Sequence, residues 1–197
     1  AAVLGRIADP SLRRRFTVKD FDLCAEVLEL EADTQAIAIE YGDIAHELSA
    51  EVAADALCQA LEIQQSRQES GAGTDLTQVV PQAADTLKED LALEVLARSL
   101  GVSVSEEEAQ ARAGAAEGYR GLTQAGLAWK TYHELLWQRV LDHYFDHPAQ
   151  GEALSAPDAM YRDLEALKEE MTAHIAPQLQ EMDWASALAR LEASPLG

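Results

Sequence analysis

The sequence predicts an all-α fold: one domain over residues 1–197, with five to seven helices packed as a bundle or a globin-like assembly. Hydrophobic residues make up 48% of the chain, and many of them are Ala and Leu, which lose little conformational entropy in a helix. Apolar residues also recur every three to four positions along extended stretches. No segment shows a pattern that we interpret as a strand.

The N-terminal quarter is expected to be helical. Residues 1–15 contain Pro10 and three consecutive arginines, and we interpret them as a short helix or an N-terminal arm lying across an acidic surface. In residues 17–48 the apolar positions alternate in steps of four and three, which is the spacing of a packed helix. A weak interruption at Ser49 predicts a bend after this helix.

Two more helices are expected in the next part of the chain. The first covers residues 50–68 and leads into a flexible link near residues 69–75, where two glycines tolerate backbone angles that other residues avoid. The second covers residues 76–100, with Pro81 near its first turn, where a missing amide hydrogen costs little. Gly101 is expected to end it.

The following helix has the strongest start signal in the chain. Ser103 or Ser105 can cap it through the hydroxyl, and three consecutive glutamates then lie at the positive end of the helix dipole. This helix is expected to reach Phe145, with a break around Gly118 and Gly121.

A final helix is expected from Pro157. Its apolar side continues through Met171 to His174 and Ile175, and after Pro177 the helix resumes toward the C-terminal residues.

The charge balance narrows the possible partners. Fifteen basic and 35 acidic residues give a net charge of −20, which a phosphate backbone or an anionic membrane would repel. Residues 20–66 contain twelve Asp and Glu residues and no Lys or Arg. Such a run is either a solvated face that maintains solubility or a docking face for a basic partner.

The cysteines suggest a reducing compartment. Cys24 and Cys58 lack the spacing of a metal site or a redox motif, so we expect reduced, buried thiols in a cytoplasmic protein. No apolar run approaches the ~18 residues that span a membrane.

An aromatic stripe with one histidine is the main candidate site. Helical spacing places Trp129, His133 and Trp137 along one side of a helix, with Tyr132 beside them. These four residues are our candidate ligand-binding residues. The histidine can line a pocket, ligate a haem iron or change its charge with pH, or it can be a core residue with satisfied ring nitrogens.

His143 and His147 are the candidate metal ligands. Two histidines four residues apart on a helix can present both imidazoles to one zinc ion. The glutamate that follows the first histidine in zinc proteases is absent here. Histidines at the end of a helix are equally explained by their favourable interaction with the helix dipole.

Carboxylates near Glu40 form a third candidate. Asp43 and His46 have the spacing of half a di-iron motif, but such a bundle needs the motif twice, and Met171 stands where the second one requires a glutamate. A solvated acidic face is the simpler interpretation. No phosphate-binding loop or nucleophile motif is present, so we assign no catalytic residue.

One stretch resembles a known family. Glu117-Gly118, Leu122, Ala128-Trp129-Lys130, His133 and Leu136-Trp137 resemble the helical N-terminal domains of stressosome co-antagonists and PucR-type regulators. The resemblance implies a sensor or regulatory domain, often dimeric and sometimes globin-like, that passes a signal to an effector. It implies no catalytic residues.

The sequence therefore favours a regulatory or ligand-sensing domain, acting through a small-molecule pocket, protein contacts or both. Its expected partner is a second copy or a protein with a basic face, and neither nucleic acid nor a membrane. The alternative is a metal-dependent helical enzyme or an oxygen- or redox-binding protein, in which haem or iron would be held by His46, His133, His143, His147 or His174. No cofactor is predicted for the regulatory or ligand-sensing domain.

Overall fold

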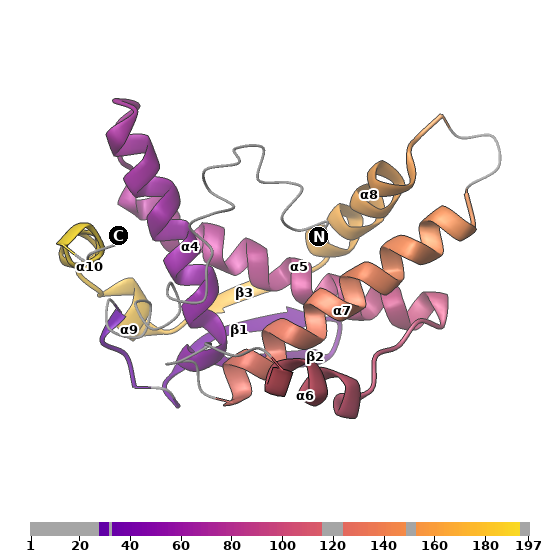
Figure 1. The fold of residues 1–197 in the computed structure, drawn as a ribbon. Helices are drawn as coiled ribbons and strands as arrows, with labels where there is room; N and C mark the ends of the chain where they lie inside the picture. Colours follow the sequence, from indigo (N-terminus) through magenta and orange to yellow (C-terminus); the bar gives the residue numbers. More distant parts are fainter. Residues whose placement is uncertain (1–27, 32, 116–123, 149–152, 194–197) are drawn as a thin grey trace.

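The computed structural model describes residues 28–31, 33–115, 124–148 and 153–193 of the 197-residue chain. Within these ranges the fold combines seven α-helices, one short 3-10 helix and a three-stranded antiparallel sheet (Figure 1). The prediction of an all-α fold is therefore wrong. The protein has a mixed α/β fold in which helices predominate.

The sheet begins with a hairpin in a segment that we expected to be helical. Strands β1 (Gln35–Tyr41) and β2 (Ile44–Ser49) pair antiparallel, and the turn between them contains Gly42, whose φ is 60°. This left-handed conformation suits glycine because it has no Cβ. The helix predicted for residues 17–48 is thus wrong from Glu29 onward in the described part of the chain, while residues 17–27 and 32 lie outside the described residues.

The third strand joins the hairpin from the other end of the chain. Strand β3 (Thr172–Ile175) pairs antiparallel with β1, so the strand order is β2-β1-β3. The predicted final helix therefore ends earlier than expected, because its last apolar positions belong to a strand. The sheet buries one face, with Ile37, Ile39 and Leu48 almost fully inaccessible.

Helix α5 (Val79–Leu100) is the central element of the helical part. It contacts α4 (Ala50–Glu69), α7 and α8, and it also contacts β3. Its small alanines let the neighbouring helices approach closely, while its leucines fill the space between them. Helix α4 starts immediately after β2, and the 3-10 helix η1 (Leu76–Gln78) leads into α5. The helices predicted for 50–68 and 76–100 are therefore confirmed within a few residues.

The end of α5 confirms the predicted stop signal. Gly101 has a φ of 69°, and the amide of Val102 donates to the carbonyl of Ala97 at 2.9 Å. This arrangement is a Schellman cap, in which a glycine adopts the left-handed conformation and the next residue closes the last turn.

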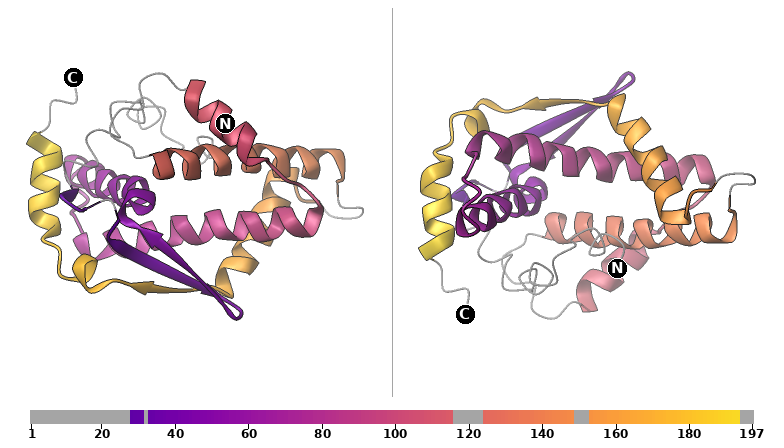
Figure 2. Two further views of the ribbon diagram at one scale, coloured as in Figure 1. Left: turned by 90° about the horizontal axis from the view of Figure 1, so that it is seen from below. Right: turned by 90° about the horizontal axis from the view of Figure 1, so that it is seen from above.

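Helices α6 (Glu106–Ala115) and α7 (Gln124–Asp146) follow. The expected break around Gly118 and Gly121 lies outside the described residues. Figure 2 shows α7 running beside α5 in the same direction, from the sheet side toward the far end of the molecule. This parallel alignment places residues of equal spacing opposite each other.

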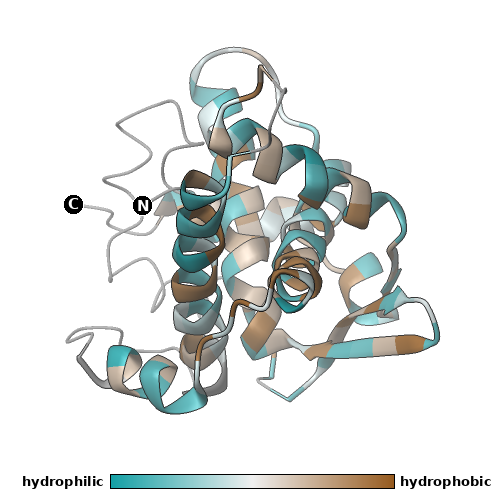
Figure 3. Ribbon diagram, turned by 90° about the vertical axis from the view of Figure 1, so that its right-hand side faces the viewer, coloured by the Kyte–Doolittle hydropathy of each residue, from teal (hydrophilic) through white to brown (hydrophobic). Residues whose placement is uncertain are grey.

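Three more helices follow in the C-terminal part of the described chain. Helix α8 (Ala156–Glu169) follows Ser155, whose hydroxyl accepts a hydrogen bond from the amide of Asp158, as expected of an N-cap. After β3 come the short α9 (Pro177–Gln180) and α10 (Trp184–Ala193). In Figure 3 hydrophilic segments cover much of the helices that face the viewer.

The state of Cys58 bears on two expectations, that the cysteines are reduced and that the protein is cytoplasmic. Its side chain is buried in α4 and disulfide-bonded, so the predicted reduced thiol is wrong for this residue; Cys24 lies outside the described residues. Disulfides are typical of oxidising compartments, which removes the cysteines as support for a cytoplasmic location. Among the described helices, none is long and apolar enough to cross a membrane.

Candidate functional site

The predicted aromatic stripe lies on α7, but the structure divides it into two parts. The rings of Trp129 and His133 lie 4.3 Å apart, and Tyr132 approaches the imidazole edge-on at 5.1 Å. Trp137 is buried and packs against Tyr161 at 5.5 Å instead. Trp129, Tyr132 and His133 therefore form one cluster, and Trp137 belongs to the core between α7 and α8.

Two carboxylates of α5 face this cluster. The indole Nε1 of Trp129 donates to Oδ2 of Asp90 at 3.0 Å, and Nε2 of His133 lies 2.7 Å from Oε1 of Glu94. The two pairs lie one helical turn apart, because Asp90 and Glu94 are four residues apart on α5 and Trp129 and His133 are four residues apart on α7. Both contacts therefore belong to the same alignment of the two parallel helices. We call Asp90, Glu94, Trp129 and His133 the α5–α7 polar cluster.

Geometry determines the protonation state of His133. Its Nδ1 lies 2.6 Å from the backbone carbonyl oxygen of Trp129, and its Nε2 faces a carboxylate oxygen. A carbonyl oxygen and a carboxylate both accept hydrogen bonds, so each ring nitrogen must carry a hydrogen. His133 is therefore an imidazolium in this arrangement.

The electrostatics agree with the geometry. Burial opposes the charge on His133, but the negative charge of Asp90, the hydrogen bond and charge of Glu94 and the Trp129 carbonyl together raise the pKa of this imidazole. Burial also raises the pKa of the Asp90 carboxyl, while His133 and the Trp129 indole act in the opposite direction. The negative charge of Asp90 and the positive charge of His133 thus favour each other.

The cluster lies at the boundary between the core and the solvent. Only 6% of the His133 side chain is exposed, whereas 25% of the Glu94 side chain is exposed. Beside it, Nζ of Lys130 donates to Oδ2 of Asp55 on α4 at 3.2 Å, and the Asp55 charge also reaches Asp90. Glu94 is therefore the partly exposed member of the cluster, and the Lys130–Asp55 ion pair beside it joins α7 to α4.

The candidate haem or iron ligand does not fit metal binding. Both nitrogens of His133 are engaged by acceptors, which leaves no lone pair for a metal ion. No group of three or more His, Cys, Asp or Glu residues in the described part of the chain has a metal-binding arrangement. The cluster can bind and release a proton, and none of its groups is placed as a nucleophile.

His143 and His147 lie where the sequence placed them, at the end of α7. Their rings stack at 4.3 Å with planes 21° apart, and Nδ1 of His147 lies 3.1 Å from the carbonyl oxygen of His143. Two ligands alone do not make a structural zinc site. The pair has no third ligand within the described ranges.

The candidates near Glu40 are strand residues. Glu40 on β1 faces His174 on β3, with Oε2 and Nε2 at 3.0 Å, and both side chains are more than half exposed. His46 lies opposite Ile39, on the other face of the hairpin. The helical di-iron arrangement is therefore excluded for these residues, because they do not lie on a helix.

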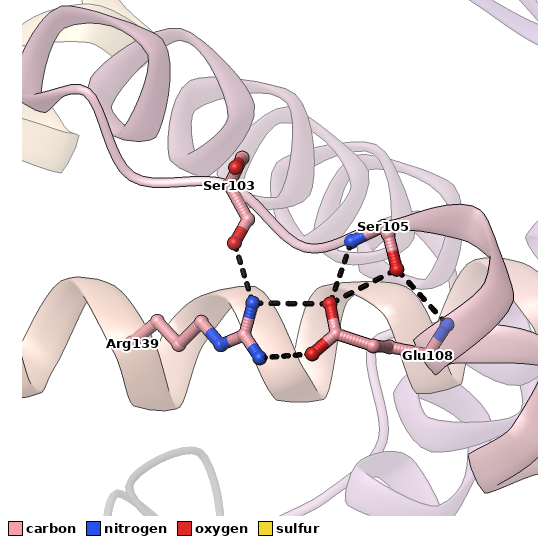
Figure 4. Close-up of polar contacts among 4 residues, drawn as sticks. All are labelled: Ser103, Ser105, Glu108 and Arg139. Atoms are coloured by element: carbon pink, nitrogen blue, oxygen red, sulfur yellow. Dashed lines mark hydrogen bonds and ion pairs between the residues drawn. The ribbon is translucent and has the colours of Figure 1, made fainter.

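The predicted cap of α6 is confirmed. The amide of Glu108 donates to the Ser105 hydroxyl, and the Ser105 amide donates back to the Glu108 carboxylate, which is a capping box. Two guanidinium nitrogens of Arg139 on α7 donate hydrogen bonds to the same carboxylate, and one of them also donates to the Ser103 carbonyl (Figure 4). These bonds lower the pKa of Glu108 to about 2, the bond from Arg139 contributing most.

The residues that sequence reasoning missed are the partners on α5. Asp90 and Glu94 are acidic positions four residues apart on a helix otherwise rich in Ala and Leu. Trp129 and His133 are two donors with the same spacing on a neighbouring helix. This match of spacing is the signal that sequence could have provided.

Comparison with protein-family models, characterised proteins and solved structures finds no match to this chain. The resemblance to stressosome co-antagonists and PucR-type regulators stays a prediction, and its residues Glu117, Gly118 and Leu122 lie outside the described ranges. Function must therefore be argued from the site itself.

Proposed function

We propose that this protein is a regulatory domain in which the α5–α7 polar cluster is the sensing element and the proton is the signal. The observation that carries the proposal is the double engagement of His133, which bonds Glu94 and the Trp129 carbonyl through its two ring nitrogens at once. Neutral imidazole has one N–H, so deprotonation leaves one of these acceptors without a donor.

The surroundings of His133 support a response across helices. Asp90 and Glu94 face it from α5, the charge of Asp55 on α4 acts on Asp90, and Lys130 on α7 is paired with Asp55. The acids favour the imidazolium, and their mutual repulsion grows when it loses its proton. Loss of the proton therefore weakens the contact of α7 with α5.

The output of such a domain is a contact with another protein. The candidates are a second copy of this chain and a protein with a basic surface, which the net charge of −20 favours. The resemblance of the α7 stretch to regulators that use helical sensor domains agrees with this function. No catalytic role is proposed.

Amide hydrogen exchange at pH 6 and pH 8.5, corrected for intrinsic exchange rates, tests the sensing element. We expect faster exchange in α5 and α7 at the higher pH, because the bridging N–H of His133 is lost. His133→Gln should abolish this pH response, and His143→Gln, on the same helix but away from the cluster, should preserve it. Equal protection of α5 and α7 at both pH values in the wild type would contradict the proposal.

A further inference from the structure

The hairpin presents an open strand edge. Strand β2 is the terminal strand of the sheet, and in Figure 2 the tip of the hairpin projects beyond the helices. The side chains of Ile44, Ala45 and Glu47 are exposed, and Ile44 is 59% exposed despite its apolar character. This strand ends the sheet without being covered along its first half by the described helices.

The alternation of hydrogen-bonded residues along the strands shows which backbone groups of β2 point away from the sheet. The amide of Ala176 donates to the carbonyl of Ala36 at 2.9 Å, so alternate residues of β1, Ala36 and then Ala38 and Glu40, direct their backbone groups toward β3. Ile39 and Tyr41 therefore bond to β2, through His46 and Ile44 opposite them. The N–H and C=O groups of Ala45 and Glu47 consequently point away from the sheet.

The two edges of the sheet differ. On β3 the outward carbonyl of Ile175 accepts a hydrogen bond from Nε2 of Gln180 at 3.1 Å, and Pro177 follows two residues later. On β2 no described hydrogen bond outside the strand ladder uses the backbone of Ala45 or Glu47. The β3 edge is thus partly blocked by its own chain, and the β2 edge is available for pairing.

The side chains along the β2 edge define the chemistry of a strand that would pair there. Glu47 on β2 and Glu40 on β1 lie on the same face of the hairpin, which we call the open face. Asp43 is exposed in the turn. On the other face Ile44 presents apolar surface. A matching strand would alternate basic residues with apolar ones.

We propose that the β2 edge binds an extended, basic segment of a partner protein, which adds as a fourth antiparallel strand. Lys or Arg residues of that segment lie opposite Glu47 on the open face, and apolar residues lie on the face of Ile44. The inference deepens the partner-binding part of the proposed function by naming the surface and the partner's chemistry. It does not depend on the protonation of His133.

The test uses a fluorescently labelled peptide, acetyl-Lys-Val-Lys-Val-Lys-Val-amide, titrated with the full chain. A control peptide of the same composition, acetyl-Lys-Lys-Lys-Val-Val-Val-amide, measures attraction to the acidic protein without the alternating pattern. We expect the alternating peptide to bind at least about tenfold more tightly. Equal affinities, or no binding of the alternating peptide, would overturn the proposal.

Two variants locate the binding. Ala45→Pro removes an outward N–H without removing a bond to β1, so binding should weaken about tenfold. Ala45→Val retains the N–H and should bind within about twofold of the wild type. Wild-type affinity in a folded Ala45→Pro variant would refute the assignment.

A measurement on the unaltered chain covers the case in which Ala45→Pro does not fold. Saturating peptide should slow hydrogen exchange at the amides of Ala45 and Glu47, and unchanged exchange there would refute the proposal. The hydrogen-exchange test of the sensing element is done without peptide. A failure of peptide binding and a failure of the pH response are therefore separate results.

Discussion

Replacing Glu94 by Gln tests whether the charge of the α5–α7 polar cluster stabilises the fold. The substitution keeps the size of the side chain and one acceptor oxygen, but it removes the negative charge opposite Nε2 of His133. The two groups are 2.7 Å apart, with 6% of the His133 side chain and 25% of the Glu94 side chain exposed. The pair is therefore shielded from water on one side and partly screened on the other.

The expected loss follows from this geometry. A hydrogen bond to a charged group contributes about 1.5–3 kcal/mol, and exposure of a quarter of Glu94 reduces this range to about 1–2 kcal/mol. The pKa of His133 is raised in the folded protein, so this stability is fully present below the unfolded pKa of about 6.5 and is lost as pH rises through the folded value. The loss should be largest near pH 6 and should shrink in alkaline solution.

Urea denaturation at pH 6 and pH 9 measures the effect. Glu134→Gln is the matched control, since Glu134 follows His133 on α7 but is exposed, and it removes the same charge from the helix that carries His133. An equal loss at both pH values, or a loss no larger than that of the control, would show that the His133–Glu94 charge pair does not stabilise the fold.

Two further changes test neighbouring parts of the structure. Trp129→Phe keeps an aromatic ring beside His133 but removes the donor to Asp90, so it should lower the unfolding free energy, measured by urea denaturation, by about 1–2 kcal/mol. An unchanged unfolding free energy would show that the Trp129–Asp90 hydrogen bond does not stabilise the fold. Ile39→Ala opens a cavity in the sheet core and should cost about 2–5 kcal/mol, whereas Ile44→Ala at the exposed tip should change the unfolding free energy little. Similar losses for the two isoleucines would contradict the burial of Ile39 and the exposure of Ile44.

The long helices were predictable because their signals are local. Apolar periodicity, the capping box of Ser105 and Glu108, and the left-handed stop at Gly101 all lie within a few residues of the elements they define. The end of α5 and the start of α6 follow from such signals. No partner elsewhere in the chain is needed to recognise them.

The hairpin was misread because its inner face mimics a helix. Ile37 and Tyr41 are four residues apart, Tyr41 and Ile44 are three apart, and Ile44 and Leu48 are again four apart, which matches a packed helix. In a hairpin the same positions share one face, because spacings of four keep a strand's side and the two-residue turn accounts for the three. Ile39 and the Gly42 turn carry the information that separates the two structures.

The pairing of β1 with β3 could not be read from any local pattern. Ile37 lies opposite Ile175, and the chain between them forms most of the helical core. A four-residue strand within an apolar stretch also continues the period of the preceding helix α8. Only the assembled sheet selects the extended conformation there.

The α5–α7 polar cluster also fixes how the two helices align. Asp90 and Glu94 match Trp129 and His133 in one register. Moving α7 by one turn, about 5.4 Å, toward the end of α5 would place His133 beside Arg98, where two positive charges would oppose each other. Moving it the other way would leave Glu94 without its imidazolium. Because the net stability of a partly buried ion pair is modest, its larger effect is to exclude these alternative alignments, and loss of the His133 proton removes that selection.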